Sequence, residues 1–158
     1  MTQPFDQAIL QTCQSEFELL AQLNHPGIVK VYDIFIDYSL ERVYTVLERA
    51  PGAELKAGAP LNVFKKICEA VAYMHAQKVC HRDLKPDNIL VHRDSVKIID
   101  FNTAVQTDAT GLVQGGAGLK EWSAPETRLQ LKYTNKCDAW SLGLILAFIL
   151  SGFTPRSG

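Results

Sequence analysis

Near the start of the chain, apolar residues recur three or four positions apart, which is the spacing of one face of an α-helix. They are Ile9, Cys13, Phe17, Leu20 and Leu23. This spacing predicts a helix that starts at about residue 9. The run Asn-His-Pro-Gly at residues 24–27 combines residues that favour turns, and it predicts the end of that helix.

Two strands are predicted next, over residues 28–35 and 43–47, because both segments are rich in β-branched and aromatic residues. Residues 37–41 predict the turn between them. The segment Glu-Arg-Ala-Pro-Gly-Ala-Glu at 48–54 then breaks the apolar pattern. The first third of the chain is therefore predicted to be one helix, two antiparallel strands and a connecting segment.

Two further helices are predicted over residues 61–77 and 138–151. The second is the most apolar segment of the chain, and Gly152 predicts its end. The first has an apolar stripe typical of a helix that packs on a core. The stripe consists of Phe64, Ile67, Cys68, Val71 and Met74.

Short apolar runs at 79–80 and 89–91 predict two strands on either side of a polar loop at 81–88, and residues 95–99 predict a third. Residues 103–122 are polar and glycine-rich and predict a loop without regular structure, a length usually associated with function. The length suits one domain of ordinary size.

The polar loop contains a carboxylate at Asp83, an ammonium group at Lys85 and a carboxamide at Asn88. Phosphoryl transfer needs these groups together: a carboxylate orients a hydroxyl and accepts its proton, a cation stabilises the moving phosphoryl group, and an amide oxygen binds Mg²⁺. The alternative is a charged, solvated turn between two strands.

The sequence His-Arg-Asp-Leu-Lys-Pro-Asp-Asn at 81–88 resembles the catalytic loop of eukaryotic protein kinases, and Lys85 resembles the serine/threonine branch. Asp-Phe-Asn at 100–102 resembles the magnesium-binding Asp-Phe-Gly of the same family, with asparagine in place of glycine. Ala-Pro-Glu at 124–126 resembles the motif that closes its activation segment.

The resemblance implies an α+β, two-lobed fold and a reaction in which the γ-phosphoryl group of ATP passes to a protein hydroxyl in the presence of Mg²⁺. Asp83 is then the base that orients the hydroxyl, and Lys85 stabilises the phosphoryl group. Asn88 and Asp100 are the implied magnesium ligands. The alternative for Asp100 alone is an aspartate in a turn at the end of a strand.

The resemblance also implies a nucleotide site along the connecting segment. Leu47 would be the gatekeeper, the backbone at Glu48 and Ala50 would bind adenine, and Glu54 would approach the ribose. Leu90 would also contact the nucleotide.

Structural and regulatory roles follow from the same resemblance. Arg82 would bind a phosphate on Thr103, Thr107 or Thr110, and Asp138 would hold the catalytic-loop backbone. A stack of Leu20, Val31, His81 and Phe101 would stand on Asp138, although the same residues are also explained as core packing. The remaining implied positions are Glu16, an ion-pairing glutamate of the first helix, and Glu126, which normally pairs with an arginine of later helices.

The matching motifs extend from the family's helix C to its helix F, so residues 1–158 are interpreted as one incomplete kinase domain. Residues 1–47 would be a residual N-lobe, 48–54 the hinge and 55–158 a partial C-lobe. No glycine-rich loop is found, and no lysine precedes Lys30 to pair with Glu16. Ala117 or Leu119 stands near the position of a threonine that bonds the catalytic loop in the family's serine/threonine kinases.

Composition narrows the function further. A net charge of −1 gives no sign of binding to nucleic acid or to an anionic membrane. The longest apolar run, 142–150, is shorter than the roughly 20 residues that a membrane helix needs. Four scattered cysteines predict buried, reduced thiols rather than a ligand pair. With no secretion signal, these features predict a protein of the cytoplasm or the nucleus.

Two functions stay open on this evidence. The chain is part of a serine/threonine protein kinase and acts on a protein substrate, with residues 1–158 alone inactive. Alternatively, it is a catalytically dead module, similar to a pseudokinase, that binds a protein partner through an open strand edge and an exposed helix. The missing lysine favours the second function, and the set Asp83, Lys85, Asn88 and Asp100 favours the first.

Overall fold

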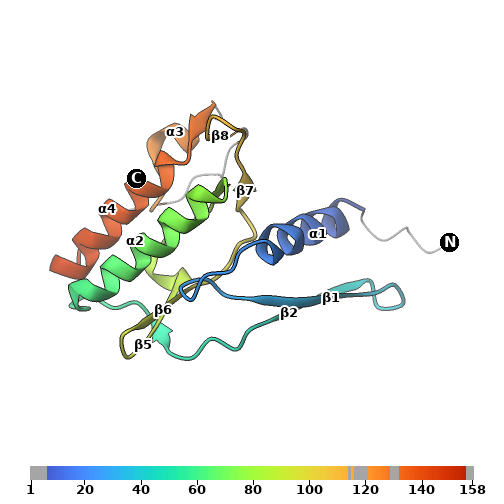
Figure 1. The fold of residues 1–158 in the computed structure, drawn as a ribbon, viewed down its shortest axis with the longest axis horizontal. Coiled ribbons are helices and arrows are strands. Elements are labelled where there is room, and N and C mark those ends of the chain that lie inside the picture. The colour runs from blue at the N-terminus through green and yellow to red at the C-terminus, as the bar shows by residue number, and fades with distance from the viewer. Residues whose placement is uncertain (1–6, 114, 116–120, 129–131, 156–158) are drawn as a thin grey trace.

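The computed structural model describes residues 7–113, 115, 121–128 and 132–155. Its elements form two groups (Figure 1). One group contains helix α1 (Gln7–Ala21) and the antiparallel strands β1 (Val31–Asp37) and β2 (Arg42–Leu47). The other contains helices α2 (Leu61–Ala76) and α4 (Lys136–Ser151), which lie side by side.

The second group also contains a three-stranded antiparallel sheet in the order β3-β5-β6. Its strands are β3 (Ala53–Glu54), β5 (Ile89–His92) and β6 (Ser95–Ile98). Helix α2 packs on β6. Helices combined with antiparallel strands confirm the α+β class predicted from the sequence.

The prediction that residues 103–122 have no regular structure is wrong for the described part of that segment. Strand β7 (Val105–Gln106) pairs with β4 (Val79–Cys80), and β8 (Leu112–Val113) pairs with β9 (Tyr133–Thr134). Strands of two residues are too short to show a period, so only their partners reveal them. Residues Ala117 and Leu119 lie outside the described residues.

The first predicted strand begins later than expected, at Val31 rather than at residue 28. Ile28 instead forms an isolated parallel bridge with Ile98 of β6. The Val29 N–H donates to the Ile98 carbonyl oxygen over 3.0 Å, and the Ile98 N–H donates to the Gly27 carbonyl oxygen over 2.8 Å. Ile28 is 1% exposed, so these residues join the first group to the core of the second.

Helix α2 supplies much of that core. Of the predicted stripe, Ile67, Val71 and Met74 are buried, whereas Phe64 and Cys68 are only half-buried. Val63 and Ala70 are fully buried and were not predicted. The buried face is therefore rotated slightly from the predicted stripe.

Helix α4 is apolar on almost every side, and it ends at Gly152, whose φ of 72° is left-handed. Ile145 and Ile149 are buried, but Trp140 and Leu150 are 50% and 66% exposed. No helix within the described ranges combines the length and the apolar character needed to cross a bilayer.

The last two residues of the predicted hinge form a strand, because residues 53 and 54 pair with Val91 and Leu90 of β5. Gly52 makes this approach close: its φ is 111°, and a Cβ built there would lie 2.3 Å from the Val91 carbonyl oxygen. Only glycine fits a left-handed position at that distance.

We therefore expect Gly52→Ala to lower the free energy of unfolding by about 3 kcal/mol, through backbone strain and displacement of β3 from β5. Urea denaturation measures the change. Gly58 is the matched control, since its φ is 78° and a Cβ there meets no atom within 4 Å. Gly58→Ala should cost only about 1 kcal/mol. Equal losses would show that contact with Val91 is unimportant.

Candidate active site

The catalytic-loop candidate lies between β4 and β5 and ends in one 3₁₀ turn, Pro86–Asn88. Proline at the first position of the turn presets its backbone, and the Asn88 N–H donates to the Lys85 carbonyl oxygen over 3.0 Å. The short turn brings side chains on both sides of Pro86 to the same place.

Three predicted groups meet there. The Asn88 Nδ2 donates to the Asp83 carbonyl oxygen over 2.9 Å and to Asp83 Oδ2 over 3.3 Å. Lys85 Nζ lies 3.8 Å from the same Oδ2. Asp83 and Asn88 are 6% and 5% exposed, whereas the Lys85 side chain is 31% exposed. A nearly buried carboxylate therefore has an amide and an ammonium group beside it.

Asp100 comes next to this cluster through the β5–β6 pairing. The Ile99 N–H donates to the Asn88 carbonyl oxygen over 2.9 Å, so the chain carries Asp100 to the end of the catalytic loop. Asp100 is exposed and has a φ of 62°. The carboxylates of Asp83 and Asp100 both act electrostatically on His81 and oppose the lowering of its pKa.

His81 is a buried and neutral part of this loop. Its Nδ1 accepts from the Asp83 N–H over 3.2 Å, so its Nε2 carries the proton and donates to the Ile99 carbonyl oxygen over 3.3 Å. Burial lowers the His81 pKa, which agrees with the neutral form. Its ring packs edge-on against Phe101, with centroids 4.8 Å apart.

Asp138 of α4 holds the beginning of the loop. Its Oδ1 accepts from the Arg82 N–H over 2.9 Å, and its Oδ2 accepts from the His81 N–H over 2.9 Å and from His75 Nε2 over 2.8 Å. Asp138 is fully buried. Burial opposes ionisation, but the hydrogen bond from His75 and the interactions with His81 outweigh it and hold the Asp138 pKa below its ordinary value.

The four residues expected to stand on Asp138 lie in the interior or pack against it. Leu20, His81 and Phe101 are buried at 2%, 0% and 1% exposure, and Val31 packs against the same core from a half-buried position. Core packing accounts for these contacts on its own.

Arg82 joins the loop to the segment after Phe101. Its φ is 67°, and its Nε donates to the Thr103 carbonyl oxygen over 2.6 Å. Its Nη1 lies 3.2 Å from the Gly115 carbonyl oxygen and 3.3 Å from the Tyr133 hydroxyl. The guanidinium group, which was expected to bind a phosphate, therefore contacts protein oxygen atoms in this structure.

The three candidate phosphorylation sites differ in their surroundings. Thr107 is 6% exposed, and its N–H donates to the Lys78 carbonyl oxygen over 2.7 Å. Thr103 is half-buried and donates its hydroxyl to the His81 carbonyl oxygen over 3.2 Å. Thr110 is exposed, with its hydroxyl on Asp108. Accessibility favours Thr110.

Glu16 is half-buried on α1 and lines a cavity of about 420 Å³ together with Arg82, Phe101 and Asn102. Burial raises the Glu16 pKa, and the negative charge of Asp100 adds to the shift. Within the described ranges, no cation lies within 4.0 Å of the Glu16 or the Glu126 carboxylate. Glu126 lies in the short helix α3 (Pro125–Arg128) and is half-buried.

The expected nucleotide residues lie at the chain junction between the two groups, from the end of β2 to β3, and on β5. Leu47 ends β2 and is 44% exposed, Ala50 is half-buried, and Glu54 and Leu90 are paired across the β3–β5 ladder. Leu90 is half-buried and Glu54 is exposed.

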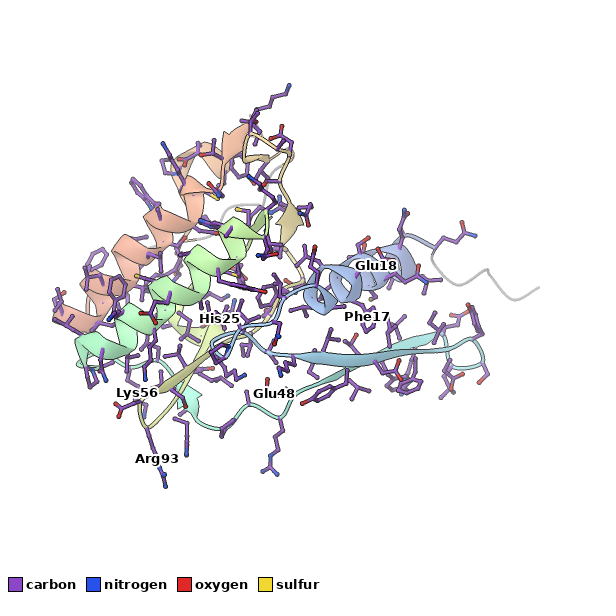
Figure 2. All side chains as sticks on the ribbon, in the orientation of Figure 1. Phe17, Glu18, His25, Glu48, Lys56 and Arg93 are labelled. Atoms are coloured by element: carbon purple, nitrogen blue, oxygen red, sulfur yellow. The ribbon has the colours of Figure 1, made fainter. Side chains whose placement is uncertain are left out.

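The Glu48 side chain has another partner, and Figure 2 shows it at that junction. Its Oε2 lies 2.8 Å from Lys97 Nζ of β6 and accepts from the Lys30 N–H over 3.1 Å. Burial pushes the Glu48 pKa upward, but these bonds outweigh it and lower the pKa. Glu48, the residue after β2, thus ties that strand to β6, and its own N–H donates to the Lys30 carbonyl oxygen over 2.8 Å.

Sequence reasoning missed several residues that support this site. His75 binds Asp138 and Tyr133 contacts Arg82, although no local pattern marks either residue. The scattered cysteines gave no sign in the sequence that Cys80 Sγ and Cys137 Sγ lie 3.4 Å apart, although both are buried free thiols as expected. Pairs distant in sequence become visible only in the fold.

Comparisons with known proteins agree with this arrangement. The model of the family described as "Protein kinase domain" matches residues 2–158. Calcium-dependent protein kinase 5 of Plasmodium berghei is 34% identical over 163 residues, which cover 94% of this chain and 28% of that kinase. Sperm motility kinase 3A of Mus musculus is 36% identical over 153 residues, covering 89% of this chain and 30% of that kinase. Calcium-dependent protein kinase 6 of Plasmodium berghei is 36% identical, and the match covers 90% of this chain and 10% of that kinase.

The fold is an α+β domain in which one short loop brings Asp83, Lys85 and Asn88 together. The chain belongs to the protein kinase domain family. It spans less than a third of the length of these relatives.

Asp138 gives a stability prediction for the site. Asp138→Asn replaces a buried acceptor by a group with two N–H donors, and should lower the free energy of unfolding near neutral pH by about 3–5 kcal/mol. The folded pKa of Asp138 is below its ordinary value of 3.8, so its contribution is complete above that value and is lost as the pH falls through the folded pKa. The difference between wild type and variant should therefore shrink in acid, as measured by urea denaturation at several pH values.

Two variants calibrate this measurement. His75→Ala removes one of the three bonds and should cost about 1.5–3 kcal/mol. Asp87→Asn alters an exposed carboxylate of the same loop and should change stability by less than about 0.5 kcal/mol. A pH-independent difference for Asp138→Asn would contradict an ionised Asp138 in the folded protein.

Proposed function

We propose that this chain carries the phosphoryl-transfer centre of a serine/threonine protein kinase, which moves the γ-phosphoryl group of ATP to a protein hydroxyl. The observation that carries the proposal is the contact set of Asp83, Lys85 and Asn88 in one short loop. Asp138 holds that loop from below through two backbone N–H groups. The alternative, a solvated turn, does not explain why Asp83 and Asn88 are nearly buried.

Asp83 is the group that handles the proton. Its carboxylate is held by Asn88 Nδ2 and faces Lys85 Nζ, so it keeps a fixed direction. A substrate hydroxyl that donates to it is oriented for attack on the γ-phosphorus, and its proton passes to the carboxylate as the bond to the β-phosphate oxygen breaks.

Lys85 acts beside this proton transfer. Its ammonium group is 3.8 Å from Asp83 Oδ2 and its side chain is 31% exposed, so it can turn toward an incoming anion. A cation placed there offsets charge on the oxygens of the transferred phosphoryl group. The serine/threonine assignment rests on this lysine and on the similarity to serine/threonine kinases.

The donors expected for Mg²⁺ fit that ion. Asn88 directs its Nδ2 to Asp83, which leaves its Oδ1 as the ligand atom, and Asp100 offers an exposed carboxylate at the neighbouring end of the loop. Both are the oxygen ligands that Mg²⁺ prefers. When bound, Mg²⁺ neutralises charge on the nucleotide phosphates.

The nucleotide is assigned to the junction between the two groups. The backbone at Glu48 and Ala50 would bind adenine, Leu47 and Leu90 would contact its ring, and Glu54 would face the ribose. The Glu48–Lys97 pair supports this role indirectly, because it fixes the distance between β2 and β6 on which such a site depends.

We expect residues 1–158 alone to transfer no phosphoryl group from magnesium-ATP to protein substrates. This polypeptide has no lysine before Lys30, and the family needs a lysine paired with the Glu16 position. Radiolabel transfer to a mixture of basic and acidic protein substrates measures the activity. Turnover that Asp83→Asn abolishes would contradict this expectation while supporting the centre itself.

The centre is tested in a chimaera that supplies the missing parts. The glycine-rich loop and lysine-bearing strands of an active protein kinase are joined ahead of Gln7. We expect measurable phosphorylation of serine or threonine, and a fall of about 10²–10⁴-fold in kcat on Asp83→Asn. The matched control is Asp87→Asn, an exposed carboxylate in the same turn, which should leave kcat within about twofold. Equal effects of the two substitutions would refute the role of Asp83.

A second candidate function is binding of a protein partner without catalysis. Exposed apolar side chains on β1 and β2 favour it, because Tyr32, Phe35 and Tyr44 are 62%, 54% and 44% exposed. Under this function, Tyr32→Ser with Phe35→Ser should abolish co-purification of a partner, and Asp83→Asn should preserve it. Loss of the partner on Asp83→Asn would favour the kinase centre instead.

A further inference from the structure

Two cysteine side chains from distant parts of the chain meet in the core beneath the catalytic loop. Cys80 is 0% exposed, Cys137 is 3% exposed, and their sulfur atoms lie 3.4 Å apart. Asp138 follows Cys137 in sequence, and one of its carboxylate oxygens lies within 4.8 Å of both sulfur atoms. Two thiols and a carboxylate thus form one buried cluster, with their ligand atoms within 4.8 Å of one another.

The three ligand atoms come from regular elements rather than from loops. Cys80 lies in β4, which is paired with β7, and Cys137 and Asp138 lie in the first turn of α4. Asp138 is further held by its hydrogen bonds with His75, His81 and Arg82. Groups fixed in this way are preorganised for a ligand.

The spacing of the sulfur atoms is close to that of a metal site. A tetrahedral ion with Zn–S bonds of about 2.3 Å separates its two sulfur ligands by about 3.8 Å. The observed 3.4 Å therefore needs to widen by only a few tenths of an ångström. Three protein ligands are also the number found in zinc sites that keep one open position.

Charge balance permits a divalent ion in this buried place. Its contact with Cys137, together with burial, raises the Cys80 pKa. When a divalent cation replaces two thiol protons, the net charge of the site stays the same. The core then avoids the cost of an extra buried charge, which would otherwise oppose binding.

We propose that Cys80, Cys137 and Asp138 form a buried binding site for a thiophilic divalent cation such as Zn²⁺. Thiolate ligands select soft and borderline ions over Mg²⁺ and Ca²⁺, so this site is chemically distinct from the oxygen donors of Asn88 and Asp100. His75, whose side chain is 21% exposed, contacts the same carboxylate and connects the site to the surface.

The site also has a structural consequence for the catalytic loop. The Asp138 carboxylate that would bind the ion already accepts the N–H groups of His81 and Arg82. A bound ion would therefore link β4, the loop and α4 through one centre. This proposal stands on the Cys80–Cys137 geometry alone and does not depend on phosphoryl transfer.

The test uses the full 158-residue chain kept reduced with a phosphine, and Cd²⁺ as the probe. The ultraviolet thiolate-to-cadmium charge-transfer band reports sulfur ligation. We expect saturation at one Cd²⁺ per chain, release of two protons to a pH indicator, and competition by Zn²⁺ but not by Mg²⁺. Absence of the band, or competition by Mg²⁺, would overturn the proposal.

The control variant is Cys13→Ser with Cys68→Ser, which removes the two half-buried cysteines and leaves only the proposed pair. It should bind Cd²⁺ as wild type does, with the same two protons released. Cys80→Ser and Cys137→Ser should each weaken binding by at least about tenfold. If either variant loses its far-ultraviolet circular dichroism, the double variant alone decides: a band supports the site, and no band overturns it.

Discussion

The buried carboxylate of Asp138 is the interaction on which the rest of the structure depends. An ionised group with no exposure is stable only if hydrogen bonds replace its lost water, and Asp138 receives three. Two of them come from the backbone of His81 and Arg82. The catalytic loop therefore begins at a fixed place on α4, and the left-handed backbone at Arg82, with a φ of 67°, is held against its strain.

Asp138 thereby helps to position two neighbouring parts of the structure. The first is the rest of the loop, where Asp83, Lys85 and Asn88 contact one another within six residues. The second is the segment after Phe101, because the guanidinium group of Arg82 binds the Thr103 carbonyl oxygen. A single buried charge thus positions the loop with Asp83, Lys85 and Asn88 and the segment beside it.

A second polar contact decides how the two groups of elements meet. Glu48 and Lys97 are only partly exposed and lie 2.8 Å apart at the junction where a nucleotide is expected. Together with the bridge between Ile28 and Ile98, this ion pair joins the small antiparallel sheet to the main core. Two strands alone are marginally stable in water, so this junction is what orders them.

The sequence by itself determined the α+β class, the positions of the three long helices within a few residues, and the identity of the loop 81–88, because helical periodicity and contiguous motifs are local properties. It did not show the short strands at Ala53–Glu54 and Val105–Gln106, the bond of His75 to Asp138, or the contact of Cys80 with Cys137. Each of these joins residues far apart in the chain and leaves no periodic signal. Only tertiary packing, which brings β4 against α4 and β3 against β5, decides such pairs.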